Sequence, residues 1–221
     1  MAEAITLTGQ ALIKKSMYET NLFVNNMLQN DTVKSYATYA DTDSQYIEMF
    51  DILQKYCPKE YTANQKTDFI DKVCKRIESK CFGPLFDKVH QELNCHKDNK
   101  AIHMDREVIA VGGEKTTTCG FWTGRKRYAI LVNDMENYRY SEPKMKIMGL
   151  ACVQSSTPEI CRKDIETFIY KLITEGIESV RDFVTAVKTT FMSKTIEEIA
   201  LPRSASNVAK YINPQTGLGL S

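Results

Sequence analysis

The chain has 221 residues, 43% of them hydrophobic, which is enough to bury one large core or two smaller ones. Its 29 Lys and Arg residues nearly balance its 28 Asp and Glu residues, so the net charge of +1 does not by itself indicate a nucleic-acid binder. Any such binding must come from a local basic cluster. The sequence has no run of about 18 apolar residues, and its N-terminus lacks the pattern of a signal peptide.

The first half of the chain predicts helices around a short pair of strands. Residues 3–29 carry apolar residues at helical spacing, which predicts a long first helix. Two short strands rich in Tyr, Val and Ile follow at about 35–40 and 44–49. Residues 64–94 then form an amphipathic helical stretch, in which Gly83-Pro84 predicts a break.

The second half predicts strands and then helices. Two alternating runs flank the turn-rich segment 111–120, VGGEKTTTCG, so we expect a long β-hairpin there. Ser156-Thr157-Pro158 is typical of a helix start, and a second helix is expected from about Ile177 to Met192, after Gly176. Together these elements predict an α+β fold with an antiparallel sheet, packed helices and a further helical part.

Asp41 and Asp43 stand two residues apart between the two short strands. Because side chains two apart on a strand share a face, a tight turn over residues 40–44 would bring both carboxylates close together. Such carboxylates repel each other unless a cation offsets their charge, and hard oxygen ligands suit Mg²⁺. The alternative is that one aspartate caps the turn, and the spacing alone leaves both interpretations open.

A basic cluster lies in the segment GRKRYAILV, where Arg125, Lys126 and Arg127 are followed by Tyr128. On an alternating strand Lys126 and Tyr128 would share a face, from which they could reach the minor groove and backbone of duplex DNA. The alternative is a charged edge strand that prevents aggregation.

The segment YADTDS, residues 39–44, resembles motif C of family B DNA polymerases, which usually reads Tyr-Gly-Asp-Thr-Asp-Ser in a palm-domain hairpin. Ala40 replaces the glycine. Other segments resemble the same family in the same order: AITLTGQALI (4–13), HMDREVIA (103–110), GFWTGRKRY (120–128), SSTPEICRKDIE (155–166) and SASNVAKY (204–211). Over residues 4–211 the chain therefore resembles a piece of a T-even-type phage polymerase.

The resemblance implies a DNA-directed DNA polymerase that transfers nucleotides with two Mg²⁺ ions. Asp43 matches the family acid that binds both metals, and Asp41 matches the acid that accompanies it. Arg125, Lys126, Arg127 and Tyr128 match the segment that grips the primer–template duplex.

Three further residues are implied in supporting roles. Asp134 matches a family residue that positions the lysine at Lys126. Asp105 and Glu107 match the place of extra acids near the metals, and an internal salt bridge with Arg106 is an equally open interpretation.

The resemblance also divides the chain: residues 1–155 match the C-terminal part of the palm, and 156–221 match the start of an incomplete thumb. Motif A, motif B of the fingers and the exonuclease acids do not occur in the sequence. We therefore expect half a catalytic site, inactive without a partner polymerase chain that carries motif A, fingers and exonuclease. The start at Met1, just before the TGQ-containing helix, favours a natural split.

The expected ligands are primer–template DNA and deoxynucleoside triphosphates, in the cytoplasm of an infected bacterial host and without a membrane. A separate thumb-containing chain and a sliding clamp stay open as further partners. One alternative function is a non-catalytic DNA-binding or assembly module derived from a palm. An unrelated phosphoryl-transfer enzyme is disfavoured, because the sequence contains no P-loop or kinase lysine motif.

Overall fold

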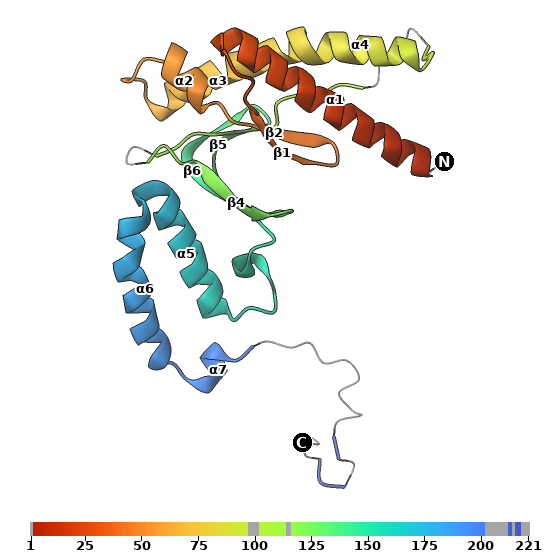
Figure 1. Ribbon diagram of the computed structural model, residues 1–221. Coiled ribbons are helices and arrows are strands. Elements are labelled where there is room, and N and C mark those ends of the chain that lie inside the picture. The colour runs from red at the N-terminus through yellow and green to blue at the C-terminus, as the bar shows by residue number, and fades with distance from the viewer. Residues whose placement is uncertain (1, 97–101, 114–115, 202–211, 214, 218–221) are drawn as a thin grey trace.

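The computed structural model describes residues 2–96, 102–113, 116–201, 212–213 and 215–217, and it confirms the α+β class (Figure 1). The helices are α1 (Ala2–Leu28), α2 (Phe50–Tyr56), α3 (Ala63–Ile77), α4 (Gly83–Glu92), α5 (Glu159–Glu175), α6 (Ile177–Met192) and α7 (Ile196–Ile199). The strands are β1 (Ala37–Asp41), β2 (Ser44–Ile47), β3 (Val108–Ala110), β4 (Gly120–Gly124), β5 (Arg127–Met135) and β6 (Tyr138–Met148). The segment 204–211 lies outside the described residues.

Several predicted elements are confirmed. The first helix, both strands around the aspartates, and the two helices on either side of Gly176 all form where the sequence places them. Gly176 has a φ of 89°, a conformation that favours glycine, and this lets the chain reverse between α5 and α6. Among the described residues, no helix is long and apolar enough to span a membrane.

The α-helix is interrupted just before Gly83-Pro84, as predicted, but by a π-helical turn instead of a loop. A π-helical turn, Glu78–Phe82, joins α3 directly to α4, and the amide of Gly83 donates to the carbonyl of Glu78 five residues earlier. Proline cannot donate the usual helical hydrogen bond, and its ring crowds the carbonyl four residues before it. The wider π turn places Pro84 in the first turn of α4, where neither problem arises.

The predicted hairpin around segment 111–120 is wrong. β3 and β4 both pair antiparallel with β5, not with each other, and β6 pairs with β5 along its other edge. Residues 114–115, between β3 and β4, lie outside the described part of the chain. The hairpins are instead β4–β5 and β5–β6, whose turns contain the positive-φ residues Lys126, Glu136 and Asn137.

The central strand β5 is buried on both faces. Ala129 and Leu131 face α5, in a cluster with Ile169 and Ile173. The alternate residues of β5 point to the other face of the sheet, where they pack against Tyr46 of β2 and the side chains of the neighbouring strand β3. Figure 1 shows the resulting layers, with α1, α3 and α4 on the side of the β1–β2 hairpin and α5 and α6 on the opposite side of β5.

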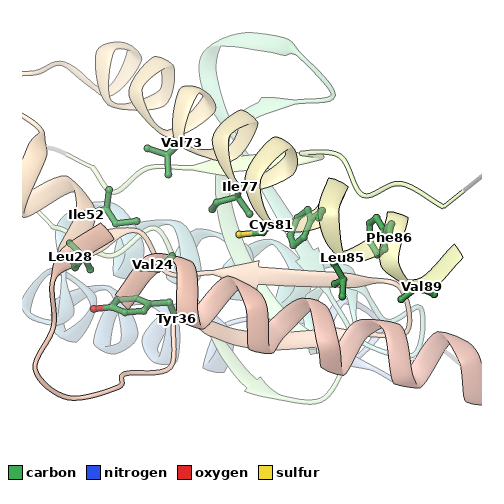
Figure 2. Close-up of a cluster of buried hydrophobic side chains, with 11 residues drawn as sticks. Val24, Leu28, Tyr36, Ile52, Val73, Ile77, Cys81, Leu85, Phe86 and Val89 are labelled. Atoms are coloured by element: carbon green, nitrogen blue, oxygen red, sulfur yellow. The ribbon is translucent and has the colours of Figure 1, made fainter. Parts of the chain in front are cut away.

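The largest core cluster joins α1 to the α3–α4 helix and to the first residues after α1. Figure 2 shows its side chains pointing into one interior, from Val24 and Leu28 on α1 to Ile77 on α3. Its buried residues are Val24, Leu28, Tyr36, Ile52, Val73, Ile77, Cys81, Phe82, Leu85, Phe86 and Val89. This cluster fixes the helical layer on which the β1–β2 hairpin rests.

Replacement of Ile77 by alanine should lower the free energy of unfolding by about 2–4 kcal/mol, because it opens a cavity in this cluster. Ile77 is 1% exposed, whereas Ile5 on α1 is 69% exposed. The matched variant Ile5→Ala should change the free energy of unfolding by less than about 0.5 kcal/mol. Urea unfolding followed by circular dichroism measures both, and equal losses would contradict the assigned core.

Candidate functional site

The two aspartates of the candidate site lie at the tip of the β1–β2 hairpin. Asp41 pairs with Ser44 across the hairpin, and the amide of Asp43 donates to the carbonyl of Asp41 at 2.7 Å. Thr42 between them has a φ of 55°, which the tight turn requires. The backbone of Asp41 thus closes the turn while both carboxylates stay available at its tip.

The two carboxylates have different surroundings. Oδ1 of Asp41 accepts from the hydroxyl of Thr42 at 3.2 Å and lies 3.6 Å from Nζ of Lys126. The side chain of Asp43 is exposed and makes no ion pair or hydrogen bond with the described residues. Asp43 is therefore an unpaired carboxylate, whereas the charge of Asp41 is partly offset by a lysine.

The basic segment is held directly beside this hairpin. Lys126 sits in the β4–β5 turn with a φ of 57°, and its amide donates to the hydroxyl of Tyr39 at 2.9 Å. Gly149 packs against the carbonyl of Lys126 so closely that no Cβ would fit there. The side chains of Arg125, Lys126 and Arg127 are all exposed. A compact cationic turn thus stands next to the aspartates.

Four aromatic rings join the two hairpins. The ring centroids of Tyr39, Tyr46, Trp122 and Tyr128 lie between 5.2 and 6.5 Å apart in every pair. Burial, and then the hydrogen bond between the hydroxyls of Tyr46 and Tyr128 at 3.0 Å, raise the pKa of Tyr46. Tilted and edge-on aromatic pairs stabilise contacts beyond their buried area, so this cluster fixes the position of one hairpin against the other.

The predicted shared face of Lys126 and Tyr128 is wrong. Lys126 lies in the turn before β5 begins, and Tyr128 is only 8% exposed, within the aromatic cluster. Tyr128 therefore supports the basic turn from within the aromatic cluster, and its hydroxyl bonds Tyr46 instead of facing solvent. The sequence analysis did not identify Tyr39 and Tyr46 as further residues that support this turn. Tyr39 lies two residues before Asp41, and Tyr46 lies two residues after Ser44.

A cavity of about 930 Å³ opens beside the hairpin and brings together acids that are far apart in the sequence. Asp43, Asp105 and Glu107 all line it. Glu107 pairs with Nζ of Lys146 at 2.9 Å, and Asp105 lies 3.5 Å from His103. The structure thus places both predicted supporting acids at the same cavity as Asp43.

The donor set fits Mg²⁺ only in part. Asp43 and Asp41 offer the carboxylate oxygens that this cation prefers. Within the described ranges, however, no three His, Cys, Asp or Glu side chains converge so that they could hold a metal ion. Additional oxygen ligands would have to come from outside these residues.

Asp134 does not lie beside Lys126. It is near the far end of β5, about eight residues and hence roughly 26 Å along the strand from Lys126. Its buried carboxylate pairs with Arg106 through Oδ1 and with Arg139 through Oδ2 at 3.1 Å. The predicted role of Asp134 in positioning the lysine therefore does not agree with the geometry, because the arginines bind it instead.

Arg106 turns away from its two acidic neighbours in the sequence. Its guanidinium pairs with Asp71 on α3 at 2.9 Å and with Asp134, and donates to Asn137 at 2.8 Å. A salt bridge of Arg106 with Asp105 or Glu107, which the sequence left open, is not among these contacts. The inward arginine leaves both acids exposed at the cavity.

Comparison with known proteins gives two matches of the same kind. The chain is 36% identical over 216 residues to the DNA-directed DNA polymerase of Escherichia phage RB69. It is 32% identical over 214 residues to the DNA-directed DNA polymerase of Enterobacteria phage T4. This chain is homologous to part of these phage DNA polymerases. The matched regions cover 95% of the chain but only 23% of each polymerase, and no protein-family model matches.

The free energy of unfolding of this chain should fall in acid, and Asp71 should account for part of that fall. Burial raises the pKa of Asp71, but its pairs with Lys75 and Arg106 outweigh burial and leave it below the usual value. A lowered folded pKa contributes stability above the ordinary aspartate pKa of about 3.9, and this stability is lost as the pH falls. Urea unfolding between about pH 6 and pH 3 should therefore show a smaller decline for Asp71→Asn than for the wild type. Equal declines would contradict this assignment.

Proposed function

We propose that the chain is the motif C part of a replicative DNA-directed DNA polymerase. In this proposal residues 1–155 form the C-terminal part of the palm and residues 156–221 the start of the thumb. The observation that carries the proposal is the combination of colinear homology to two phage polymerases with Asp43, an unpaired acid, beside a basic turn. The chain spans about a quarter of those polymerases, so the remaining parts would come from elsewhere.

In the proposed mechanism Asp43 is the main metal ligand of this chain and Asp41 the accompanying one. Bound Mg²⁺ would supply charge stabilisation for attack of the primer 3′-hydroxyl on a deoxynucleoside triphosphate. The exposed carboxylate of Asp43 is ready to bind without first losing a partner, whereas Asp41 must share its charge with Lys126. Asp105 and Glu107 would add negative charge at the same cavity.

The basic turn would bind the primer–template duplex. Arg125, Lys126 and Arg127 are exposed, and the aromatic cluster below them holds the turn in place. Cations that meet phosphates bind all sequences alike, as replication requires. Tyr128 contributes by supporting this turn.

The missing catalytic acid would come from a partner chain that carries motif A and fingers. Within the described residues β2 pairs only with β1, and β3 only with β5, yet both strands line the same cavity. Gln45, whose buried Oε1 has no hydrogen-bond partner among the described residues, is one of the residues that line the cavity. We propose that a palm strand of the partner lies there, satisfies these backbone edges and brings its aspartate towards Asp43.

A complementation experiment tests this function. RB69 polymerase without the matched region serves as the probe for the partner, and each polypeptide is also assayed alone. The mixture should form a 1:1 complex with an interface of about 2,000 Å² or more and extend a primer with Mg²⁺, while neither part does so alone. Asp43→Ala should keep the complex and lower extension at least about a hundredfold, Asp41→Ala should lower it less, and Asp31→Ala is the control.

The possible results separate the two candidate functions. Extension by this chain alone would contradict the need for a partner, and full activity of Asp43→Ala would contradict the metal-ligand role. A complex that binds DNA but does not extend it, in the wild-type form, would favour the non-catalytic module. Absence of a complex would contradict the proposed docking place.

Lys126→Ala should weaken binding of primer–template DNA to the complex equally for different sequences. It should also reduce the slope of log affinity against log salt by about 1, because one phosphate contact is lost. Lys163→Ala removes the same charge from an exposed position on α5 and is the matched control. Fluorescence anisotropy at several salt concentrations measures both variants, and a sequence-selective defect would argue against the phosphate role.

A further inference from the structure

A buried ionic network lies at the end of the sheet opposite the basic turn. Arg106 is its centre, with a side chain only 7% exposed. The guanidinium reaches acceptors on three elements: Asp71 on α3, Asp134 on β5 and Asn137 in the β5–β6 turn. The amide of Arg106 also donates to Oε1 of Glu78 in the π-helical turn at 2.9 Å. Both the side chain and the backbone of this residue are therefore fixed.

The residues on each side of Arg106 show the opposite exposure. The side chain of Asp105 is 75% exposed and that of Glu107 is 54% exposed. Adjacent side chains of an extended segment point to opposite sides. The cavity that Asp43 lines also runs past Arg106 and α3, so the bonds that anchor Arg106 to α3 fix the segment that carries both acids along the cavity wall.

We propose that Arg106 is a positioning residue that holds Asp105 and Glu107 at the rim of this cavity. The inference rests on the proposed function in that these acids belong to the same candidate site. Arg106 itself touches neither the cavity-facing carboxylates nor Asp43 in the described contacts. It acts through the backbone of the segment that precedes β3.

Lysine could not replace Arg106 in this role. The guanidinium is a planar fork that binds acceptors in several fixed directions, whereas an ammonium group is a single point charge on a flexible stem. With lysine at position 106, Asp71, Asp134 and Asn137 could not all keep their bonds. The buried Asp134 would still have Arg139, so the network would loosen locally around residue 106.

Zero-length carbodiimide cross-linking measures the position of Glu107 without any polymerase assay. Glu107 lies 2.9 Å from Nζ of Lys146, so carbodiimide should join the two side chains through an amide bond. Mass spectrometry gives the yield relative to the Glu159–Lys163 cross-link on α5, whose atoms are 2.6 Å apart. In the full chain, Arg106→Lys should lower this relative yield about tenfold, because intramolecular reactions depend steeply on position.

Arg139→Lys is the matched control, because Arg139 also binds Asp134 but does not flank the cavity acids. It should leave the relative yield within about twofold of the wild type. If Arg106→Lys does not fold, as judged by circular dichroism, Asn137→Ala removes a single acceptor and should give a partial loss of the cross-link.

An unchanged yield in both Arg106→Lys and Asn137→Ala would overturn the proposal. An equal loss in Arg139→Lys would overturn it as well, since the effect would then be a general loosening of the network. Loss in the Arg106 variant alone supports the positioning role. Because the cross-link needs no DNA, metal or partner, a failure of the proposed polymerase function would leave this result readable on its own.

Discussion

The burial of β5 on both faces is the constraint on which the other parts of the structure depend. Its residues from Tyr128 to Asp134 are all buried, so each face of the strand needs its own cover. Helix α5 covers one face, and the β1–β2 hairpin packs Tyr46 against the other. The aspartate-bearing hairpin is therefore placed by the need to cover β5, and helix α5 is part of the same packing.

The two ends of β5 carry different chemistry because they are stabilised differently. At its start, aromatic rings hold a solvent-exposed basic turn, an arrangement that leaves the cations free for an anionic partner. At its end, Asp134 is only 5% exposed and needs its two arginines, because an unpaired buried charge is very costly. The strand thus separates a surface suited to binding from an ionic anchor that fixes α3 to the sheet.

The sequence predicted elements well where the signal was local. Helical spacing, Pro158 and Gly176 located α1, α5 and α6, and the Asp-x-Asp turn located β1 and β2. The short helix α2 was missed, because seven residues give little periodicity. The pairing of β3 with β5 could not be predicted, since alternation identifies a strand but not its neighbour. The π turn at Gly83 likewise depends on how the helix packs, which spacing does not record.

For the candidate site, residue types were predicted better than their contacts. The sequence identified Asp41 and Lys126, which the structure pairs, and Asp43, which lies in the same turn as Asp41. It also identified Asp105 and Glu107, which line the cavity with Asp43, although they are some 60 residues away in the chain. The partners of Asp134 and Arg106 were not predicted, because charged residues in a sequence carry no sign of which opposite charge they will meet. Such pairings follow from the tertiary fold.

The charge distribution around the hairpin bears on the choice between the two candidate functions. A module that only bound DNA would gain from cations at this surface and lose from every unpaired acid, since carboxylates repel phosphates. Yet Asp43 stands exposed and unpaired, within the described contacts, next to the basic turn. Asp105 adds a second exposed carboxylate at the same cavity. Acids in this place are unfavourable for a purely DNA-binding surface, whereas a divalent cation between them and the DNA would turn the repulsion into attraction. The arrangement therefore favours the metal-dependent polymerase over the binding module.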